Sequence, residues 1–328
     1  MAATADTAAG IHCLPIPTPF AVGRVNTYLI EDDPLTLVDS GPNSGTSLTT
    51  LEAALAEHGR QVADLERIVV THQHMDHIGL VKILADRSGA EVCALDLLGP
   101  WLADYSGGME ADDRFAEAIM SRHGIPEDIR YALRAVSANF RAWGASATVT
   151  HELREGDELA FADRTWRVWH RPGHSPSDTV FHDEASGLLV GGDHLIKHIS
   201  SNPLIARPLT GEREERPKSL RIYLDSLAAT REMDVITVLA GHGEPIDDHA
   251  TLIDERIRLH ERRAEKLHRL IAERPRTAYE LAQAMWGNVA VTQAYLTLSE
   301  VLGHTDLLVD AGRVTEVEQD GVVRFTAT

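Results

Sequence analysis

The sequence predicts a mixed α/β protein with a second, smaller domain at its C-terminal end. Up to about residue 247, short β-rich runs alternate with helical patterns and with turns marked by Gly, Pro and Asp. Three helical patterns and a hairpin pattern then follow. A length of 328 residues suits one large and one small domain, and 43% hydrophobic residues can supply the core. We therefore expect one domain at residues 1–247 and another at residues 248–328.

The first domain begins with β-rich runs. Val25–Ile30 and Leu35–Val38 predict a hairpin, residues 44–58 predict a helix, and the apolar run that contains Ile68 predicts a strand. Residues 96–146 carry aromatic and aliphatic side chains at helical spacing, which predicts a helical insertion. Further strand patterns, each bounded by Gly, Pro or Asp, lie at residues 159–161, 165–170, 179–181, 188–190 and 235–239.

The C-terminal segment has a different pattern. Residues 248–272 predict one long charged helix, Thr277 can cap a helix at residues 278–286, and residues 292–311 predict a third helix. Residues 314–317 and 322–326 flank Asp-Gly and predict a hairpin. Helices followed by a hairpin are typical of a winged-helix domain.

The charge of the chain and its first ten residues limit the partners and the cellular location that we expect. The formal charge is -19, which disfavours a polyanionic partner such as nucleic acid. Met1–Gly10 has neither a basic residue nor an apolar core, so we expect no signal peptide, and no later apolar run is long enough to cross a bilayer. Cys13 and Cys93 lack the spacing of a zinc or redox motif. We expect a cytoplasmic protein.

A dense histidine motif lies directly after the Ile68 strand. Thr71–His77 reads Thr-His-Gln-His-Met-Asp-His, with three imidazoles and one carboxylate within six positions. Imidazole and carboxylate groups are ligands of zinc, iron and manganese, and histidines this close would repel one another if protonated without a cation between them. The motif therefore predicts a metal site.

Three later segments place ligand-type side chains among glycines at the ends of predicted strands. They contain His174, Asp193 and His242. Because the ends of several strands can converge on one point, these residues can complete the site. We expect the seven ligands to hold two metals: His72, His74 and His174 at the first, Asp76, His77 and His242 at the second, and Asp193 between them.

The ordered combination of His72-x-His74-x-Asp76-His77 with the three later ligands, and with Val38-Asp39-Ser40-Gly41 upstream, resembles the metallo-β-lactamase-fold hydrolase superfamily. The resemblance spans about residues 11–245. It implies an αββα sandwich of two facing sheets, with the metals at one rim. Within the superfamily, the chain resembles the glyoxalase II and lactamase-beta-like protein 2 type. Residues 248–328 also resemble the C-terminal extension of lactamase-beta-like protein 2 and its bacterial relatives, and the segments Gly192–Leu195 and Ile199–Pro203 resemble the same proteins.

Details within the resemblance favour some branches of the superfamily. The antibiotic-destroying enzymes generally carry Cys or Ser in place of the bridging aspartate, so Asp193 argues against a true β-lactamase. The acyl-homoserine lactonases carry a tyrosine where this chain has Ile196. Gly79-Leu80 departs mildly from the Gly-Gly of many relatives and leaves every ligand in place.

The ligand set predicts a hydrolytic mechanism. A single zinc lowers the pKa of water to about 7, so a hydroxide bridging two metals can attack a carbonyl or thioester carbon at neutral pH. Asp76 and Asp193 are the predicted catalytic carboxylates, and Asp39 is expected to hold the histidine loop in place. Three further residues are candidate substrate contacts: His194, Lys197 and His198.

The winged region offers little to nucleic acid. Residues 275–328 contain three basic and seven acidic residues, and the third helical pattern has neither Lys nor Arg. In the long helix predicted at residues 248–272, basic and acidic residues are interleaved, which favours an ion-paired, solvated helix face. We expect this region to pack, dimerise or cover the active site rather than bind DNA.

These observations lead to one function and two alternatives. We expect a dinuclear metal-dependent hydrolase of a small thioester, ester or lactone, with two divalent ions, zinc first and iron or manganese as alternatives. The alternatives are a single-strand endoribonuclease of the lactamase-beta-like protein 2 type and a winged-helix regulator with a metal-sensing domain. No membrane or nucleic-acid partner is expected, and a homodimer stays open.

Overall fold

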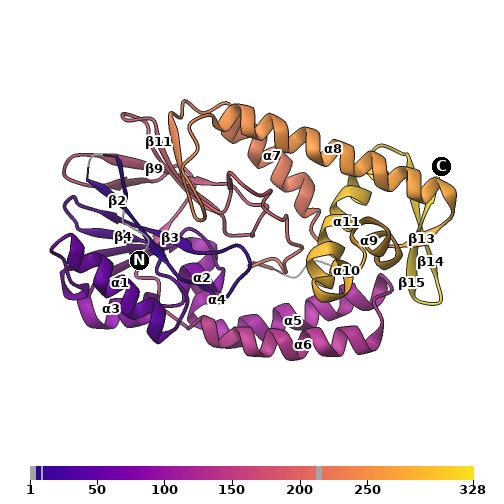
Figure 1. Ribbon diagram of the computed structural model, residues 1–328, viewed down its shortest axis with the longest axis horizontal. Coiled ribbons are helices and arrows are strands. Elements are labelled where there is room, and N and C mark those ends of the chain that lie inside the picture. The colour runs from indigo at the N-terminus through magenta and orange to yellow at the C-terminus, as the bar shows by residue number, and fades with distance from the viewer. Residues whose placement is uncertain (1–4, 9, 212–215) are drawn as a thin grey trace. The chain divides into compact units, whose positions relative to one another are not determined.

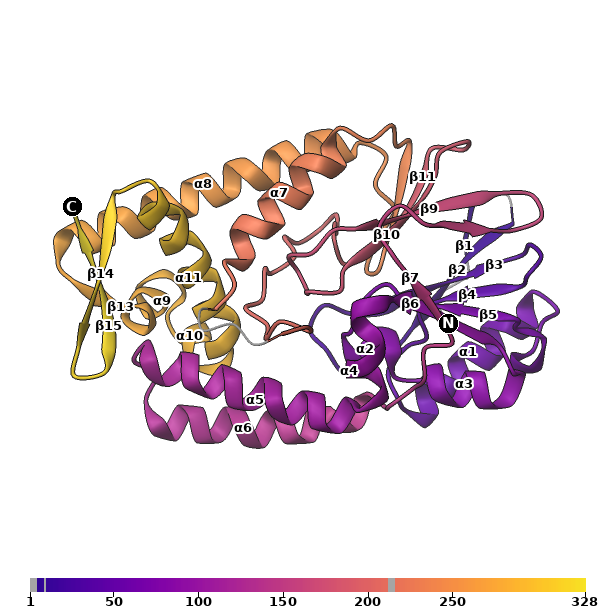
Figure 2. The same ribbon diagram turned by 180° about the vertical axis from the view of Figure 1, so that it is seen from behind.

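The computed structural model describes residues 5–8, 10–211 and 216–328. These residues form two compact units. The first contains the described residues of 1–109, 140–201 and 232–249, and the second contains the described residues of 110–139, 202–231 and 250–328. Figures 1 and 2 show the chain from opposite sides, with most of its helices and strands labelled. The predicted division of the chain between residues 247 and 248 stays a prediction.

The first unit contains a seven-stranded sheet with its strands in sequence order. The strands are β1 (Ala5–Ala8), β2 (Ile11–Ile16), β3 (Val25–Ile30), β4 (Thr36–Val38), β5 (Arg67–Val69), β6 (Glu91–Leu95) and β7 (His151–Leu153). The pairs from β1 to β4 are antiparallel, which fits their short connections, whereas β4 to β7 are parallel. Helices α1 (Gly45–Glu57), α2 (Met75–Ile78) and α3 (Val81–Ser88) provide two of the crossovers.

A second, five-stranded sheet in the same unit has the order β12-β11-β10-β9-β8. Its strands are β8 (Glu158–Ala160), β9 (Thr165–His170), β10 (Thr179–Asp183), β11 (Leu188–Gly192) and β12 (Thr237–Ala240). Only the β11–β12 pair is parallel. One apolar cluster joins the two sheets, with Val38 and Val69 from the first sheet and Trp166 and Phe181 from the second. The sheets therefore pack face to face, as predicted.

The predicted helical insertion is present. It contains α4 (Gly99–Ala103), α5 (Tyr105–Arg122) and α6 (Glu127–Phe140), flanked by short 3-10 turns at Asp96–Leu98 and Arg141–Trp143. Within the second unit, Asp113 of α5 accepts a hydrogen bond of 2.6 Å from Ser137 of α6. The two helices are thus held together by a polar contact as well as by packing.

The second unit carries the C-terminal elements that the sequence predicts. They are α8 (His249–Glu273), α9 (Ala278–Trp286), α11 (Ala294–Asp310) and the strands β14 (Val314–Gln319) and β15 (Val322–Ala327). Thr277 caps α9 in a reciprocal capping box with Glu280, as its position predicts. Three elements of this unit are not predicted: helix α7 (Ser219–Arg231), the short helix α10 (Val289–Thr292) and the short strand β13 (Arg276–Thr277), which completes a three-stranded sheet. The winged-helix assignment stays a prediction.

Among the described residues, no helix has both the length and the apolar character needed to cross a lipid bilayer. The predicted absence of a signal peptide concerns Met1–Gly10, of which residues 1–4 and 9 lie outside the described residues. That prediction and the expected cytoplasmic location stay open.

Candidate metal centre

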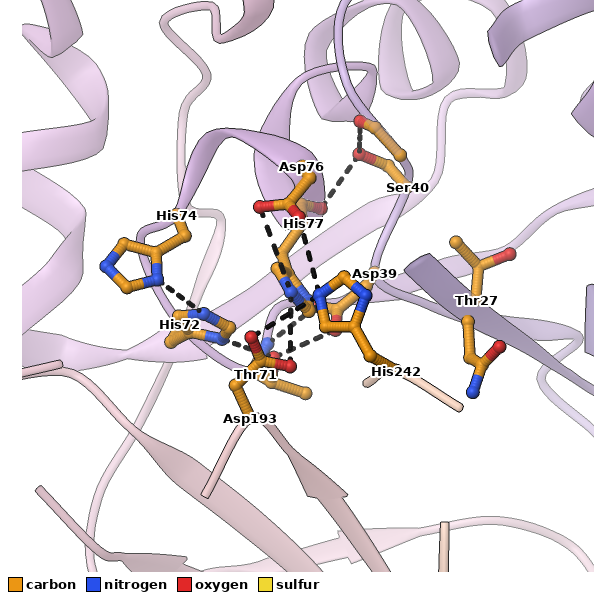
Figure 3. A network of polar contacts seen from close by, with 12 residues as sticks. Thr27, Asp39, Ser40, Thr71, His72, His74, Asp76, His77, Asp193 and His242 are labelled. Carbon is orange, nitrogen blue, oxygen red and sulfur yellow. Dashed lines mark hydrogen bonds and ion pairs between the residues drawn. The ribbon is translucent and has the colours of Figure 1, made fainter. Parts of the chain in front are cut away.

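Loops that follow four strands of the first unit bring the seven predicted ligands together. The histidine motif follows β5, whereas His174, Asp193 and His242 follow β9, β11 and β12 respectively. Figure 3 shows the side chains of six of these ligands gathered around a common centre: His72, His74, Asp76, His77, Asp193 and His242. The strand ends of both sheets therefore converge as the sequence predicts.

The first predicted group consists of three imidazole nitrogens. The Nδ1 atom of His74 lies 3.1 Å from Nε2 of His72 and 2.9 Å from Nε2 of His174. Two nitrogens bound to one tetrahedral zinc at 2.0 to 2.1 Å are about 3.3 Å apart. The spacing of these nitrogens is therefore close to what a shared cation requires.

The second predicted group combines a carboxylate with two imidazoles. Nε2 of His242 lies 3.4 Å from Oδ2 of Asp76, and Nε2 of His77 lies 4.0 Å from Oδ1 of the same carboxylate. All three residues are buried. A buried set of two nitrogens and one carboxylate suits zinc, iron or manganese.

Asp193 lies between the two groups. Its Oδ2 atom is 3.6 Å from Nε2 of His174 and 3.4 Å from Nε2 of His242. Its Oδ1 atom is 3.5 Å from Nε2 of His77. Since His174 belongs to the first group and His242 and His77 to the second, one carboxylate reaches both groups.

Hydrogen bonds fix the orientation of three imidazoles. Nδ1–H of His77 donates to Asp39 at 2.7 Å, and Nδ1–H of His242 donates to the carbonyl of Arg24 at 2.7 Å. Nδ1 of His72 lies 3.0 Å from Oγ1 of Thr71, which itself donates to Asp39. In each neutral ring the lone pair then lies on Nε2, toward the centre.

Several inward atoms are buried without a hydrogen-bond partner. Within the described residues these are Nε2 of His77, Nε2 of His242 and Oδ1 of Asp193. A buried polar atom of this kind is costly unless water or an ion satisfies it. The donor set of the centre therefore fits divalent metal ions.

The charges of the centre also favour a cation. Burial, with the neighbouring His174 next, lowers the pKa of His74 to about 3, and burial lowers the pKa of His72 as well, so both rings are neutral and able to ligate. Burial opposes a charge on His242, but Asp193 outweighs it and raises the pKa of His242 to about 9. The pKa of Asp193 is lowered because its histidine partners outweigh burial. The carboxylate therefore carries its charge.

Asp39 joins the motif to the β4 loop. Its Oδ1 accepts the backbone N–H of Thr71 at 2.9 Å, and its Oδ2 accepts the hydroxyl of Thr71 at 2.8 Å as well as Nδ1–H of His77. The residue has a φ of 58°, in the left-handed region. These contacts are those that the predicted supporting role of Asp39 requires. Thr71 carries no signal of this role in the sequence beyond its place directly before His72.

The loop of His174 is anchored by polar residues whose role is not predicted from the sequence. Asp178 accepts hydrogen bonds from the backbone N–H and the hydroxyl of Ser175, both at 2.7 Å. Ser177 donates to the side chain of Gln73 at 3.1 Å, and its oxygen accepts the backbone N–H of Gln73 at 3.1 Å. These contacts tie the His174 loop to the histidine motif, and no sequence spacing could have indicated them.

Two glycines leave room for the centre. A Cβ at Gly241 would lie 2.3 Å from Oδ1 of Asp193 and 2.9 Å from Cε1 of His77. Gly192 has a φ of +48°, and a Cβ there would lie 2.9 Å from Thr71. The backbone at both positions therefore approaches the centre more closely than any larger residue permits.

The three candidate substrate contacts differ in their placement. His194 is buried, and burial, with Arg171 next, lowers its pKa to about 3. Lys197 and His198 are exposed, and the ammonium of Lys197 lies 3.5 Å from Glu244. An acidic substrate group would therefore compete with Glu244 for Lys197. The substrate role of all three residues stays a prediction.

A family model described as "Metallo-beta-lactamase superfamily" matches residues 21–242, which include all seven clustered ligand-type residues. The chain belongs to this superfamily. A Bacillus subtilis (strain 168) relative named "Probable metallo-hydrolase YqjP" is 33% identical over 319 residues, covering 97% of this chain and 98% of that protein. A Caenorhabditis elegans "Beta-lactamase-like protein 2 homolog" is 22% identical over 78% of this chain and 68% of its own length.

A solved structure extends the similarity of fold across the chain. The "metallo-beta-lactamase family protein TTHA1429" from Thermus thermophilus has a TM-score of 0.81 and 26% identity, covering 98% of this chain and 100% of that one. The family and fold class predicted from the sequence are thereby confirmed. The similarity includes the C-terminal elements, which the family model does not reach.

Proposed function

We propose that this chain is a dinuclear metal-dependent hydrolase of small carbonyl substrates. The observation that carries the proposal is the position of Asp193, whose carboxylate lies 3.4 to 3.6 Å from imidazole nitrogens of both groups. His72, His74 and His174 would hold one divalent ion, and Asp76, His77 and His242 the other. Zinc suits this donor set, and iron and manganese are alternatives.

The metals would supply Lewis acidity, which lowers the pKa of a bound water and polarises a carbonyl oxygen. The chain itself supplies orientation and charge. Asp39, Thr71 and the carbonyl of Arg24 hold Nδ1 of three histidines, so that each Nε2 faces the centre. Asp76 and Asp193 place two carboxylates beside the reacting position, where they can orient a water molecule and accept its proton.

The substrate class follows from the ligand set and the charge of the chain. A small thioester, ester or lactone needs no basic surface, in keeping with a formal charge of -19. A nucleic acid substrate would need Lys or Arg groups for its phosphates. The relative named as a metallo-hydrolase supports hydrolysis as the reaction type.

The proposal is tested with a panel of thioester, ester, lactone, β-lactam and RNA substrates, with the metal content measured on the same preparation. We expect turnover of at least one small carbonyl compound and its loss in a chelator. Turnover that persists in the chelator would contradict the proposal. Cleavage of RNA alone would favour the endoribonuclease, and a specific shift of duplex DNA without turnover would favour the regulator.

Two matched pairs of variants connect the activity with the centre. Asp193→Asn removes a charge between the two groups, whereas Asp163→Asn removes an exposed charge of the same unit. His74→Gln removes a nitrogen that contacts two other imidazoles, whereas His151→Gln changes an exposed histidine. We expect only Asp193→Asn and His74→Gln to lose activity, by about 10²-fold or more.

A further inference from the structure

The two predicted ligand groups share one plan, in which each draws on both sheets of the first unit. Two ligands of each group follow β5 of the seven-stranded sheet. The third ligand, His174 in the first group and His242 in the second, follows β9 or β12 of the five-stranded sheet. The geometry of each group therefore depends on a contact that fixes a strand end of one sheet against the other sheet.

Asn26 on β3 joins the seven-stranded sheet to the loop that carries His242. Its side-chain Nδ2 donates to the carbonyl of Ala240 at 3.0 Å and to that of Gly243 at 2.8 Å. Its backbone N–H donates to the carbonyl of Gly241 at 2.7 Å. Since Ala240 and Gly243 lie on either side of His242 in the chain, one buried residue of the first sheet holds the loop at both ends.

The amide group of Asn26 suits this contact. A carboxamide nitrogen carries two hydrogens, and each has its own carbonyl acceptor here, so the donor capacity of the amide is fully used. An ionised aspartate has nearly the same shape but only accepts hydrogen bonds. Asn26→Asp would therefore set a carboxylate oxygen against two carbonyl oxygens and push the His242 loop away from β3.

A different pair of residues joins the two sheets beside His174. Ser177 is fully buried, and its hydroxyl donates to the side-chain carbonyl of Gln73 at 3.1 Å. The same oxygen accepts the backbone N–H of Gln73 at 3.1 Å. Because Gln73 stands between His72 and His74 in the sequence, this contact ties the His174 loop directly to the other two ligands of the first group.

We propose that Asn26 and Ser177 are positioning residues, one for each metal ion. Asn26 sets the affinity of the second group for its ion, and Ser177 sets that of the first group. The two contacts share no residue, so the two affinities can be changed separately. This inference rests on the proposed dinuclear centre and adds to it a separate support for each ion. Both residues act through the ligands and touch neither ion.

The first test is zinc titration of the full-length chain with only the second group intact. His74→Gln with His174→Gln gives this background, because it breaks the first group. Loss of a residue that supports a metal ligand costs about 10- to 100-fold in metal affinity. We expect Asn26→Asp to weaken zinc binding in this background by about that factor, and Ser177→Ala to leave it nearly unchanged.

The reciprocal titration keeps only the first group intact. Asp76→Asn with His242→Gln gives this background. We expect Ser177→Ala to weaken zinc binding here by about 10- to 100-fold, and Asn26→Asp to leave it nearly unchanged. This reversal is a readout that a general loss of stability cannot produce, because a less stable fold lowers the affinity of both groups.

Thr27→Val is the matched control. Thr27 is the next residue on β3, is buried, and donates its hydroxyl to the carbonyl of Leu14 on β2 at 3.1 Å, a contact within one sheet. We expect this variant to keep its zinc affinity in both backgrounds. If Asn26→Asp folds poorly, Tyr28→Phe replaces it, since it removes a hydroxyl that donates to Ala240 at 2.7 Å. We expect it to weaken only the second group, by a smaller factor.

A measurement on the chain with all its ligands gives the same answer without the broken backgrounds. At limiting zinc, anomalous diffraction from Asn26→Asp crystals should show the peak beside His242 weakened and the peak beside His174 retained, and Ser177→Ala crystals the reverse. Equal weakening of both ions by either variant, or weakening by neither, would overturn the positioning roles while two zinc ions still bind the wild type. A wild-type chain that binds only one zinc contradicts the proposed dinuclear centre itself.

Discussion

Gly241→Ala is the substitution that most sharply probes the position of Asp193. An added Cβ would lie 2.3 Å from Oδ1 of Asp193, whereas real Cβ contacts do not fall below 3.0 Å. The carboxylate must therefore move by at least 0.7 Å, because 3.0 minus 2.3 Å is 0.7 Å. The main chain of Gly192 lies 3.1 Å from the same Cβ, so the backbone cannot easily yield instead.

The expected effect falls mainly on the metal centre. Displacement of a reacting or ligating group by about 1 Å costs about 10²-fold in rate, and the overpacking itself costs about 1 to 3 kcal/mol of stability. We expect Gly241→Ala to fold, to bind the second metal at least about 10-fold more weakly, and to lose about 10²-fold in activity.

The assay combines zinc titration, turnover of the substrate found by the panel, and thermal unfolding. Gly45→Ala is the matched control, because a Cβ at Gly45 meets nothing within 4 Å and the residue begins helix α1. We expect the control to keep its metal and its activity. Gly241→Ala with wild-type metal affinity and turnover would refute the reasoning that places Asp193 against both groups.

Three further predictions concern the rest of the molecule. Asp306 forms a bidentate ion pair with the partly buried Arg216, so Asp306→Ala should lower the free energy of unfolding, measured in urea, by about 3 kcal/mol. Asp310→Ala breaks a more exposed pair with Lys218 and should lower it by under about 1 kcal/mol. Equal losses of stability in the two variants would contradict this prediction. Burial raises the pKa of Cys13 to about 11 and that of Cys93 to about 12. At pH 8 about 1 in 1,000 of the Cys13 thiols and about 1 in 10,000 of the Cys93 thiols are therefore thiolates. A thiol reagent should modify both residues slowly in the native chain and rapidly in denaturant. Removal of metal should lower the melting temperature of the first unit, and a melting curve that a chelator leaves unchanged would argue against a metal-stabilised centre.

Local sequence patterns predict the elements whose signals lie within a few residues. The hairpin of β3 and β4 and the cap at Thr277 are of this kind, because alternation, turn residues and capping chemistry act over short spans. Strand β7 has only three residues, two of them exposed, and becomes a strand by pairing with β6. Such a strand depends on its neighbour, so its sequence carries no signal.

In the metal centre too, some features follow from local sequence and others from contacts between distant residues. Ligand identity follows from residue type and from strand-end position, and the structure brings all seven predicted ligands together. The contacts that orient them join residues far apart in the chain, such as Asn26 with the carbonyls of Ala240 and Gly243, and Ser177 with Gln73. These partners are set by the packing of two sheets, which one sequence does not reveal.

In the proposed hydrolase, Asp193 links two metals in the metallo-β-lactamase domain. Anomalous diffraction from crystals of the metal-loaded chain tests it directly. We predict two peaks in this domain, about 3.5 to 4 Å apart, one beside His72, His74 and His174 and the other beside Asp76, His77 and His242, with the carboxylate of Asp193 contacting both. A single peak in this domain, or two peaks that Asp193 does not join, would rule out the bridging role of Asp193.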